Sequence, residues 1–132
     1  MRPTLTYRQI MVENNHAGGK LWGTEFGWST FDGLHFESHV NGAPAVPAGD
    51  PWMNRITEQQ QAEFTVRAFE LAQTGDLAGY MGPMMLWNMN FATLPEFVKA
   101  DQPSRPEAGF SVLDADWATR LVYRYIEAAP KQ

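Results

Sequence analysis

The sequence contains no cysteine, which excludes disulfide bonds and thiolate chemistry. No apolar run approaches the roughly 20 residues of a membrane-spanning helix, and residues 1–20 lack the apolar centre of a signal peptide. Lysine and arginine form no cluster, and the formal net charge of −5 argues against the phosphate backbone of nucleic acid as a ligand. These absences predict a cytoplasmic protein that binds neither nucleic acid nor membranes.

The remaining composition is that of a globular protein. Of the 132 residues, 44% are apolar and 19% are charged, so the chain can bury a core, and we expect a single domain over residues 1–132. Five tryptophans, eight phenylalanines and four tyrosines make up a heavy aromatic content. Aromatic side chains of this kind either pack the core or stack against the flat faces of sugar rings.

Hydrophobic spacing predicts three helices and two strands in alternation. The helices cover residues 4–15, 57–74 and 116–128, and short strands at 20–25 and 83–88 separate them. The expected capping residues are Thr4 or Thr6 for the first helix, Thr57 with Gln60 for the second, and Asp114 or Asp116 for the last. Such an order predicts an α/β fold with parallel strands.

The predicted α/β fold has two long connecting segments and a sheet of only two strands. Two loops, over residues 31–55 and 92–113, are longer than most loops of small domains, which is typical of functional segments. Two apolar parallel strands alone leave both sheet edges unpaired and cannot cover themselves. The sequence therefore predicts that further strands complete the sheet, and we expect a homo-oligomer.

Three segments resemble one enzyme superfamily. Residues 20–30, Lys-Leu-Trp-Gly-Thr-Glu-Phe-Gly-Trp-Ser-Thr, are similar to the strand-seven segment of the retaining (β/α)₈-barrel glycoside hydrolases, which include cellulases, β-glucosidases, β-xylosidases and β-galactosidases. Residues 83–91, Pro-Met-Met-Leu-Trp-Asn-Met-Asn-Phe, resemble strand eight of those enzymes. Residues 110–123 resemble their last loop and closing helix. The resemblance implies the C-terminal part of such a barrel.

The resemblance also implies roles for individual residues. Glu25 matches the nucleophile, and Trp87 matches the tryptophan that floors the sugar subsite beside the cleaved bond. Asn88 and Asn90 are then candidates to bind sugar hydroxyls, although they can equally satisfy the loop backbone. Trp28 is a candidate for an outer subsite. We expect Trp22, by contrast, to lie in the core.

The chain departs from the family in length and in its second carboxyl group. A barrel of this type needs roughly 250 residues, so the chain is expected to form only a partial (β/α)₈ (TIM) barrel with two strands and three helices. Retaining hydrolysis needs two carboxyl groups about 5 Å apart. The family places its acid/base glutamate after strand four in an Asn-Glu pair, and no Asn-Glu dipeptide occurs here.

The loop after Glu25 offers candidates for the missing acid. Asp32, His35, Glu37 and His39 lie close together in sequence, and one of them can act as a proton donor if the loop folds back. The alternative is a solvated loop. These side-chain types also bind metals, but no zinc-motif spacing occurs, so we expect no metal and no cofactor.

The sequence thus favours a retaining glycoside hydrolase that acts on β-glucoside-like carbohydrates with Glu25 as nucleophile. One alternative is a non-catalytic, carbohydrate-binding or structural fragment of a barrel. Another is a subunit that completes a barrel together with a separate N-terminal chain. The missing acid can also come from another subunit of a homo-oligomer. An unrelated α/β domain is the remaining alternative.

Overall fold

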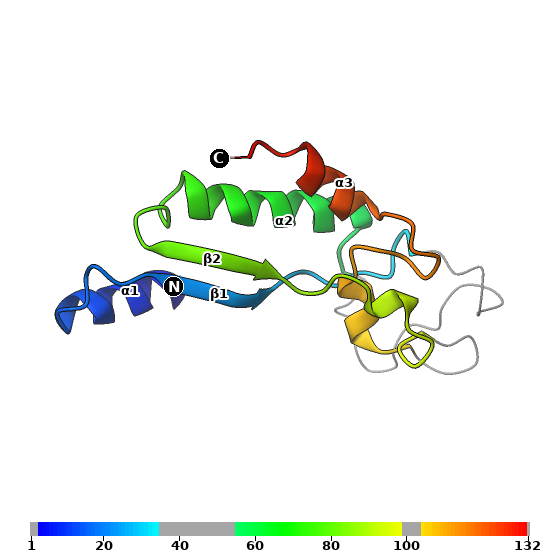
Figure 1. Cartoon of the computed structure of the whole chain (residues 1–132), viewed down its shortest axis with the longest axis horizontal. Coiled ribbons are helices and arrows are strands. Elements are labelled where there is room, and N and C mark those ends of the chain that lie inside the picture. The colour runs from blue at the N-terminus through cyan, green and yellow to red at the C-terminus, as the bar shows by residue number, and fades with distance from the viewer. Residues whose placement is uncertain (1–2, 35–54, 99–103, 132) are drawn as a thin grey trace. The chain divides into compact units, whose positions relative to one another are not determined.

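The computed structural model describes residues 3–34, 55–98 and 104–131 (Figure 1). In these ranges the chain forms two compact units, and we describe each by itself. The strand unit consists of Met1–Phe26 and Arg67–Leu86, and the loop unit consists of Gly27–Val66 and Trp87–Gln132. The predicted segments 35–54 and 99–103 of the two long loops lie outside the described residues.

The strand unit is built on two parallel strands. β1 (Leu21–Phe26) pairs with β2 (Met81–Leu86) in parallel, from Leu21 opposite Met81 to Phe26 opposite Leu86. Two register irregularities between these pairs compensate each other, because both strands advance by the same number of residues. The parallel pair confirms the predicted α/β order. The sheet has two strands in the described part of the chain, so the partial barrel and its completion by self-association remain predictions.

A helix covers the strands. α2 (Glu58–Gln73) runs beside β2 in Figure 1, and its second half belongs to the strand unit. There the ring of Phe69 meets the ring of Phe26 edge to face, with 5.0 Å between centroids. At the other end of the strands, the Lys20 ammonium donates to the Gly79 carbonyl oxygen over 2.9 Å. These contacts fix the helix and the turn before β2 against the sheet.

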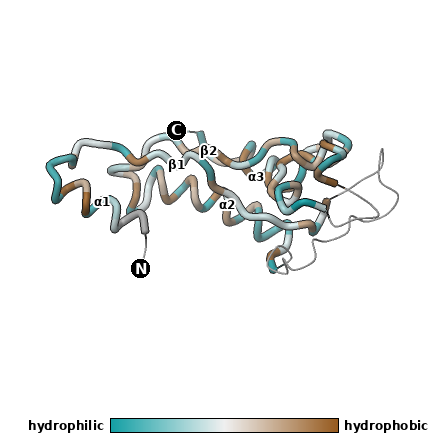
Figure 2. The backbone as a smooth tube through the Cα atoms, turned by 90° about the horizontal axis from the view of Figure 1, so that it is seen from below, coloured by the Kyte–Doolittle hydropathy of each residue, from teal (hydrophilic) through white to brown (hydrophobic). Residues whose placement is uncertain are grey.

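Much of the apolar surface of the strand unit lies open. Tyr80 is its one buried apolar residue in the described ranges, whereas five large apolar side chains are exposed: Tyr7, Ile10, Val12, Trp22 and Met85. Three of these lie on α1 (Pro3–Glu13), along which apolar and hydrophilic residues alternate in Figure 2. The expectation that Trp22 is a core residue is wrong, because 61% of its surface is exposed.

The loop unit contains nearly all of the core. A cluster of buried apolar residues lies there, with Phe97 and Phe110 packed against it: Phe31, Leu34, Ala92, Val98, Ala108 and Ala115. Two short 3₁₀ helices, η2 (Phe91–Thr93) and η3 (Pro106–Phe110), contribute to this cluster. The predicted 92–113 loop is therefore ordered by short helical turns in its described parts.

The capping box of α2 is confirmed. The Thr57 amide donates to Gln60 Oε1 over 2.9 Å, and the Gln60 amide donates to Thr57 Oγ1 over 3.1 Å. This reciprocal pair satisfies two backbone donors that a helix start otherwise leaves unbonded. The apolar face predicted for this helix is only partly buried, since the buried residues of α2 are Gln61, Ala62 and Thr65.

Other helix and strand starts differ from the prediction. α1 begins at Pro3, which suits the first turn of a helix, so Thr4 and Thr6 lie inside the helix and not at the position before it. β2 begins two residues earlier than predicted, because Met81 pairs with Leu21, and it ends before Trp87.

The last helix also starts later than predicted. α3 covers Leu121–Ala128, and Arg120 is its N-cap residue, without a side-chain cap. Asp114 Oδ1 instead accepts the amides of Asp116 and Ala118, each over 3.1 Å. Trp117, in this turn, has a left-handed backbone with φ of 64°. A helix cannot pass through that conformation, so the expected start at residue 116 and the expected caps Asp114 and Asp116 are wrong.

Candidate functional site

The predicted nucleophile lies at the end of a parallel strand. Glu25 is the last residue but one of β1, and its side chain is exposed. Phe26, the next residue, packs on Phe69 of α2. The adjacent aromatic contact therefore holds the backbone at the strand end, while the Glu25 carboxylate faces solvent.

Few other carboxylates in the strand unit are free to pair with Glu25. Glu70 forms an ion pair with Arg67 over 3.0 Å, and Glu13 accepts a hydrogen bond from Gln9 over 2.8 Å. Asp76 also has an interaction partner. Each carboxylate described in this unit, apart from Glu25, therefore has an interaction partner.

The predicted sugar-binding residues after β2 belong to the loop unit. Trp87 is half-buried between two phenylalanine rings, with centroids 5.4 Å from Phe91 and 5.2 Å from Phe110. Asn88 is buried, and its side chain donates to the Glu107 carbonyl over 2.8 Å and accepts from the Phe91 amide over 3.0 Å. Asn88 therefore holds the loop backbone that surrounds Trp87.

Asn90 and Trp28 differ in how far they are engaged. The Asn90 carbonyl accepts the amide and the hydroxyl of Thr93, whereas its side chain makes no hydrogen bond within the described residues. Trp28 is half-buried, with its ring centroid 5.8 Å from that of Phe64. The Trp28 carbonyl accepts from Gln61 over 2.6 Å. Asn90 is thus the better placed of the two to bind a ligand.

The acid candidates divide into one described residue and three that lie outside the described residues: His35, Glu37 and His39. Asp32 is exposed, and its Oδ2 accepts the Glu58 amide at the start of α2 over 2.8 Å. This hydrogen bond satisfies one of the backbone donors that the start of a helix leaves unbonded. Asp32 therefore acts in the loop unit as a helix-terminal acceptor.

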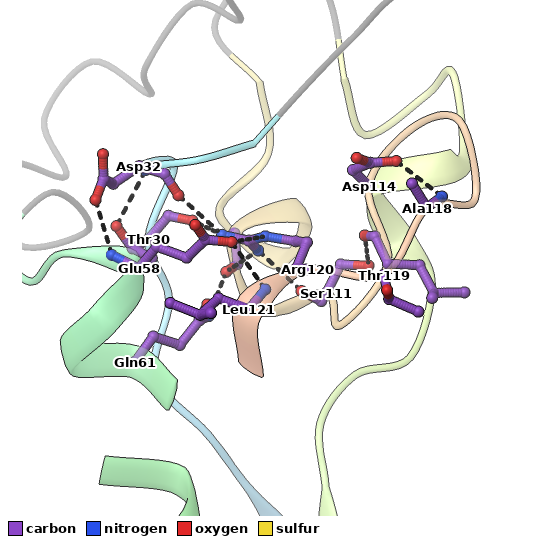
Figure 3. Close-up of polar contacts among 12 residues, drawn as sticks. Thr30, Asp32, Glu58, Gln61, Ser111, Asp114, Ala118, Thr119, Arg120 and Leu121 are labelled. Atoms are coloured by element: carbon purple, nitrogen blue, oxygen red, sulfur yellow. Dashed lines mark hydrogen bonds and ion pairs between the residues drawn. The ribbon is translucent and has the colours of Figure 1, made fainter. Parts of the chain in front are cut away.

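A buried arginine forms the densest polar network of the loop unit (Figure 3). Arg120 is 2% exposed, and its guanidinium donates to four carbonyl oxygens, those of Thr30, Asp32, Gly109 and Ser111, over 2.8 to 3.1 Å. These carbonyls lie in the segment after β1 and in the segment from η3 onward. One side chain therefore joins both segments to the start of α3.

The same arginine faces carboxylates. Its Nε lies 4.0 Å from Glu58 Oε1, which also accepts the Leu121 amide over 3.0 Å. Burial lowers the pKa of Arg120 from its ordinary value to about 10, and the carboxylates of Glu58, Asp114 and Asp32 act in the opposite direction. Arg120 consequently remains a cation at neutral pH.

A pocket of about 350 Å³ opens beside this network, within the loop unit. Its lining includes four charged residues, Glu58, Asp114, Arg120 and Arg124, together with Thr119 and Gly33. Gly33 has φ of 71°, and a Cβ at this position would collide with the Glu58 carboxylate. Glycine thus leaves room for that carboxylate in the pocket wall.

Sequence reasoning did not identify Arg120 or Gln61. Gln61 is buried in α2, and its Nε2 donates to the carbonyls of Trp28 and Gly109 over 2.6 and 2.9 Å. Each residue sits in a helical pattern that predicts an exposed polar side chain. No local sequence pattern marks either residue as buried.

Within the described residues, no group of three or more metal-binding side chains lies together, and no helix is long and apolar enough to cross a membrane. Comparisons with protein-family models, curated proteins and solved structures gave no match.

Proposed function

We propose that the chain carries the nucleophile of a retaining β-glycosidase, Glu25, and acts on β-glucoside-like carbohydrates. The observation that supports the proposal is the position of Glu25: an exposed carboxylate near the C-terminal end of a strand that pairs in parallel with a second strand. Barrel enzymes hold their catalytic residues at this end of their strands. The resemblance of residues 20–30 to the strand-seven segment of the retaining glycoside hydrolases supports the role of this carboxylate as the nucleophile.

The reaction proceeds in two displacements. A Glu25 oxygen forms a bond to the anomeric carbon, and the bond from that carbon to the leaving oxygen breaks. The leaving oxygen keeps the electron pair and takes up a proton from an acid or from water, so it departs as an alcohol. Water then attacks the anomeric carbon, releases the Glu25 carboxylate and loses its proton to a base. The net reaction consumes one water and yields the free sugar and an alcohol. An aryl leaving group with a low pKa departs without a proton, so it bypasses the missing acid.

A second copy of the chain is the partner that we propose for completing the sheet. The strand unit exposes Trp22, Met85 and the apolar residues of α1, and its two strands have unpaired edges within the described ranges. A second copy offers the matching features, namely parallel strands and an apolar face of its own. Association removes both from water, and it brings carboxylates of another chain toward Glu25.

Hydrolysis of 4-nitrophenyl β-D-glucoside tests Glu25. Replacing Glu25 with glutamine keeps its size but removes its charge, and we expect the rate to fall by about a thousandfold or more, as for removal of other nucleophiles. The matched control is Glu13→Gln, which removes one exposed carboxylate from α1 of the same unit. Equal rates for the Glu25 variant and the unmodified chain would refute the assignment.

Azide rescue distinguishes a nucleophile from an acid/base. In Glu25→Ala, azide can occupy the space of the lost carboxylate and attack the anomeric carbon opposite the leaving group. We expect recovered release of nitrophenol and a glucosyl azide of inverted, α configuration. A β-glucosyl azide would instead indicate that Glu25 serves as the acid/base.

A non-catalytic carbohydrate-binding role is the second candidate, because the other described carboxylates of the strand unit are engaged. Its readout is quenching of tryptophan fluorescence by cellobiose without any release of glucose. Hydrolysis that depends on Glu25 would exclude this role.

A further inference from the structure

We propose that the pocket beside Arg120 binds a neutral polyhydroxylated ligand, such as a sugar, through paired hydroxyl groups. The site lies wholly in the loop unit, and its argument does not depend on Glu25. It rests on three observations: the charge balance of the pocket wall, an unused buried donor and the carboxylate oxygens that face it.

The charges of the wall favour a neutral ligand. Two cations, Arg120 and Arg124, and two carboxylates, Glu58 and Asp114, line the same space. A phosphate or sulfate meets both carboxylates, and a metal ion meets both guanidinium groups, so each incurs repulsion together with attraction. A hydroxyl group has both a donor and an acceptor, and it can satisfy both signs of charge at once.

The unused donor is Arg120 Nε. This atom is buried and has no hydrogen-bond partner in the described structure, because Glu58 Oε1 lies 4.0 Å away and is too distant for a hydrogen bond. Buried donors are nearly always bonded, and one left unbonded destabilises the fold. Because Nε is buried, a ligand hydroxyl reaches it only when the pocket wall moves aside; the hydroxyl would then accept this hydrogen bond and donate to the Glu58 carboxylate.

The rest of the wall offers a second set of contacts. Asp114 Oδ1 already accepts two backbone amides, and no hydrogen bond to its Oδ2 occurs among the described residues. Arg124 Nη2 donates one hydrogen bond, 3.3 Å long, to the Thr119 carbonyl. The remaining donors of Arg124 and the free oxygen of Asp114 suit the donor and acceptor of a second hydroxyl group.

Arginine-detected NMR with cellobiose tests the site on the full chain. Arg120 Nε–H gives its own nitrogen–proton signal, and we expect that signal to shift as cellobiose is added at millimolar concentrations. Arg124→Ala should weaken cellobiose binding about tenfold or more, as expected for loss of a charge-assisted hydrogen bond. The control Arg67→Ala removes an exposed arginine from the strand unit and should leave binding unchanged.

Two results would contradict the proposed ligand site. A fixed Arg120 signal at saturating cellobiose would overturn the proposal, and so would a shift produced by sodium sulfate but not by cellobiose. Glu25→Gln should leave cellobiose binding at Arg120 intact, so a failure of the glycosidase proposal is separable from a failure of this one. Thr119→Val provides a second variant of the pocket wall if Arg124→Ala unfolds.

Discussion

Replacing Arg120 with methionine is expected to destabilise the loop unit by about 2.5–3.5 kcal/mol. The variant keeps a long apolar side chain but removes the donors to four carbonyl oxygens. The Gly109 carbonyl retains two other donors, the Gln61 side chain and the Thr30 amide. The loss therefore falls on the carbonyls of Thr30, Asp32 and Ser111. Each of their charge-assisted hydrogen bonds contributes about 1.5 kcal/mol or more. Burial of the methionine returns about 1–2 kcal/mol of that loss.

Urea unfolding followed by circular dichroism measures the change, and hydrogen exchange locates it. The Thr30 amide, which donates to the Gly109 carbonyl over 3.1 Å, should lose protection. The Leu21 amide of the strand unit, bonded to the Tyr80 carbonyl over 2.8 Å, serves as the internal reference. Arg67→Met is the matched control, because Arg67 forms only an exposed ion pair. A loss below about 1 kcal/mol, the range of exposed ion pairs, would refute the reasoning.

Two further predictions concern the start of α2 and the open sheet. Thr57→Val removes the acceptor for the Gln60 amide and should cost about 1 kcal/mol in urea unfolding, whereas Thr57→Ser should cost little; equal losses would show that the capping oxygen is not responsible. If a second copy covers the sheet, light scattering should show association at micromolar concentration, and Met85→Lys should weaken it because it places a charge on the exposed strand β2. A clean monomer for the unmodified chain at that concentration would refute self-association.

Local signals were sufficient to predict the order of elements and the start of α2. The capping box of Thr57 and Gln60 spans three residues, so its chemistry is written within the helix start itself. The short segments of β1 and β2 likewise predict strands, because the pattern of apolar residues in a strand follows from the local geometry of the sheet. Such features depend on residues that are close in sequence, so they can be predicted without knowledge of the fold.

The Arg120 network could not be predicted in this way. Arg120 binds the Thr30 carbonyl from 90 residues away, and nothing near Arg120 in sequence distinguishes it from an exposed helical arginine. The late start of α3 has a similar origin, since Asp114 captures two amides that a helix starting at residue 116 would use, and Trp117 adopts a left-handed backbone. Trp22 was misplaced because strand alternation identifies two faces but not which one is covered.

The exposure of Glu25 bears on catalysis as well as on assembly. A carboxylate in open water is strongly hydrated, and it is a weaker nucleophile than one held in a dry, preorganised site. If a second copy covers Trp22 and Met85, association also removes water from the strand ends. The rate of hydrolysis per chain should then rise with protein concentration over the same range in which scattering detects association. A constant rate per chain across that range would show that hydrolysis by Glu25 does not depend on association of the chains.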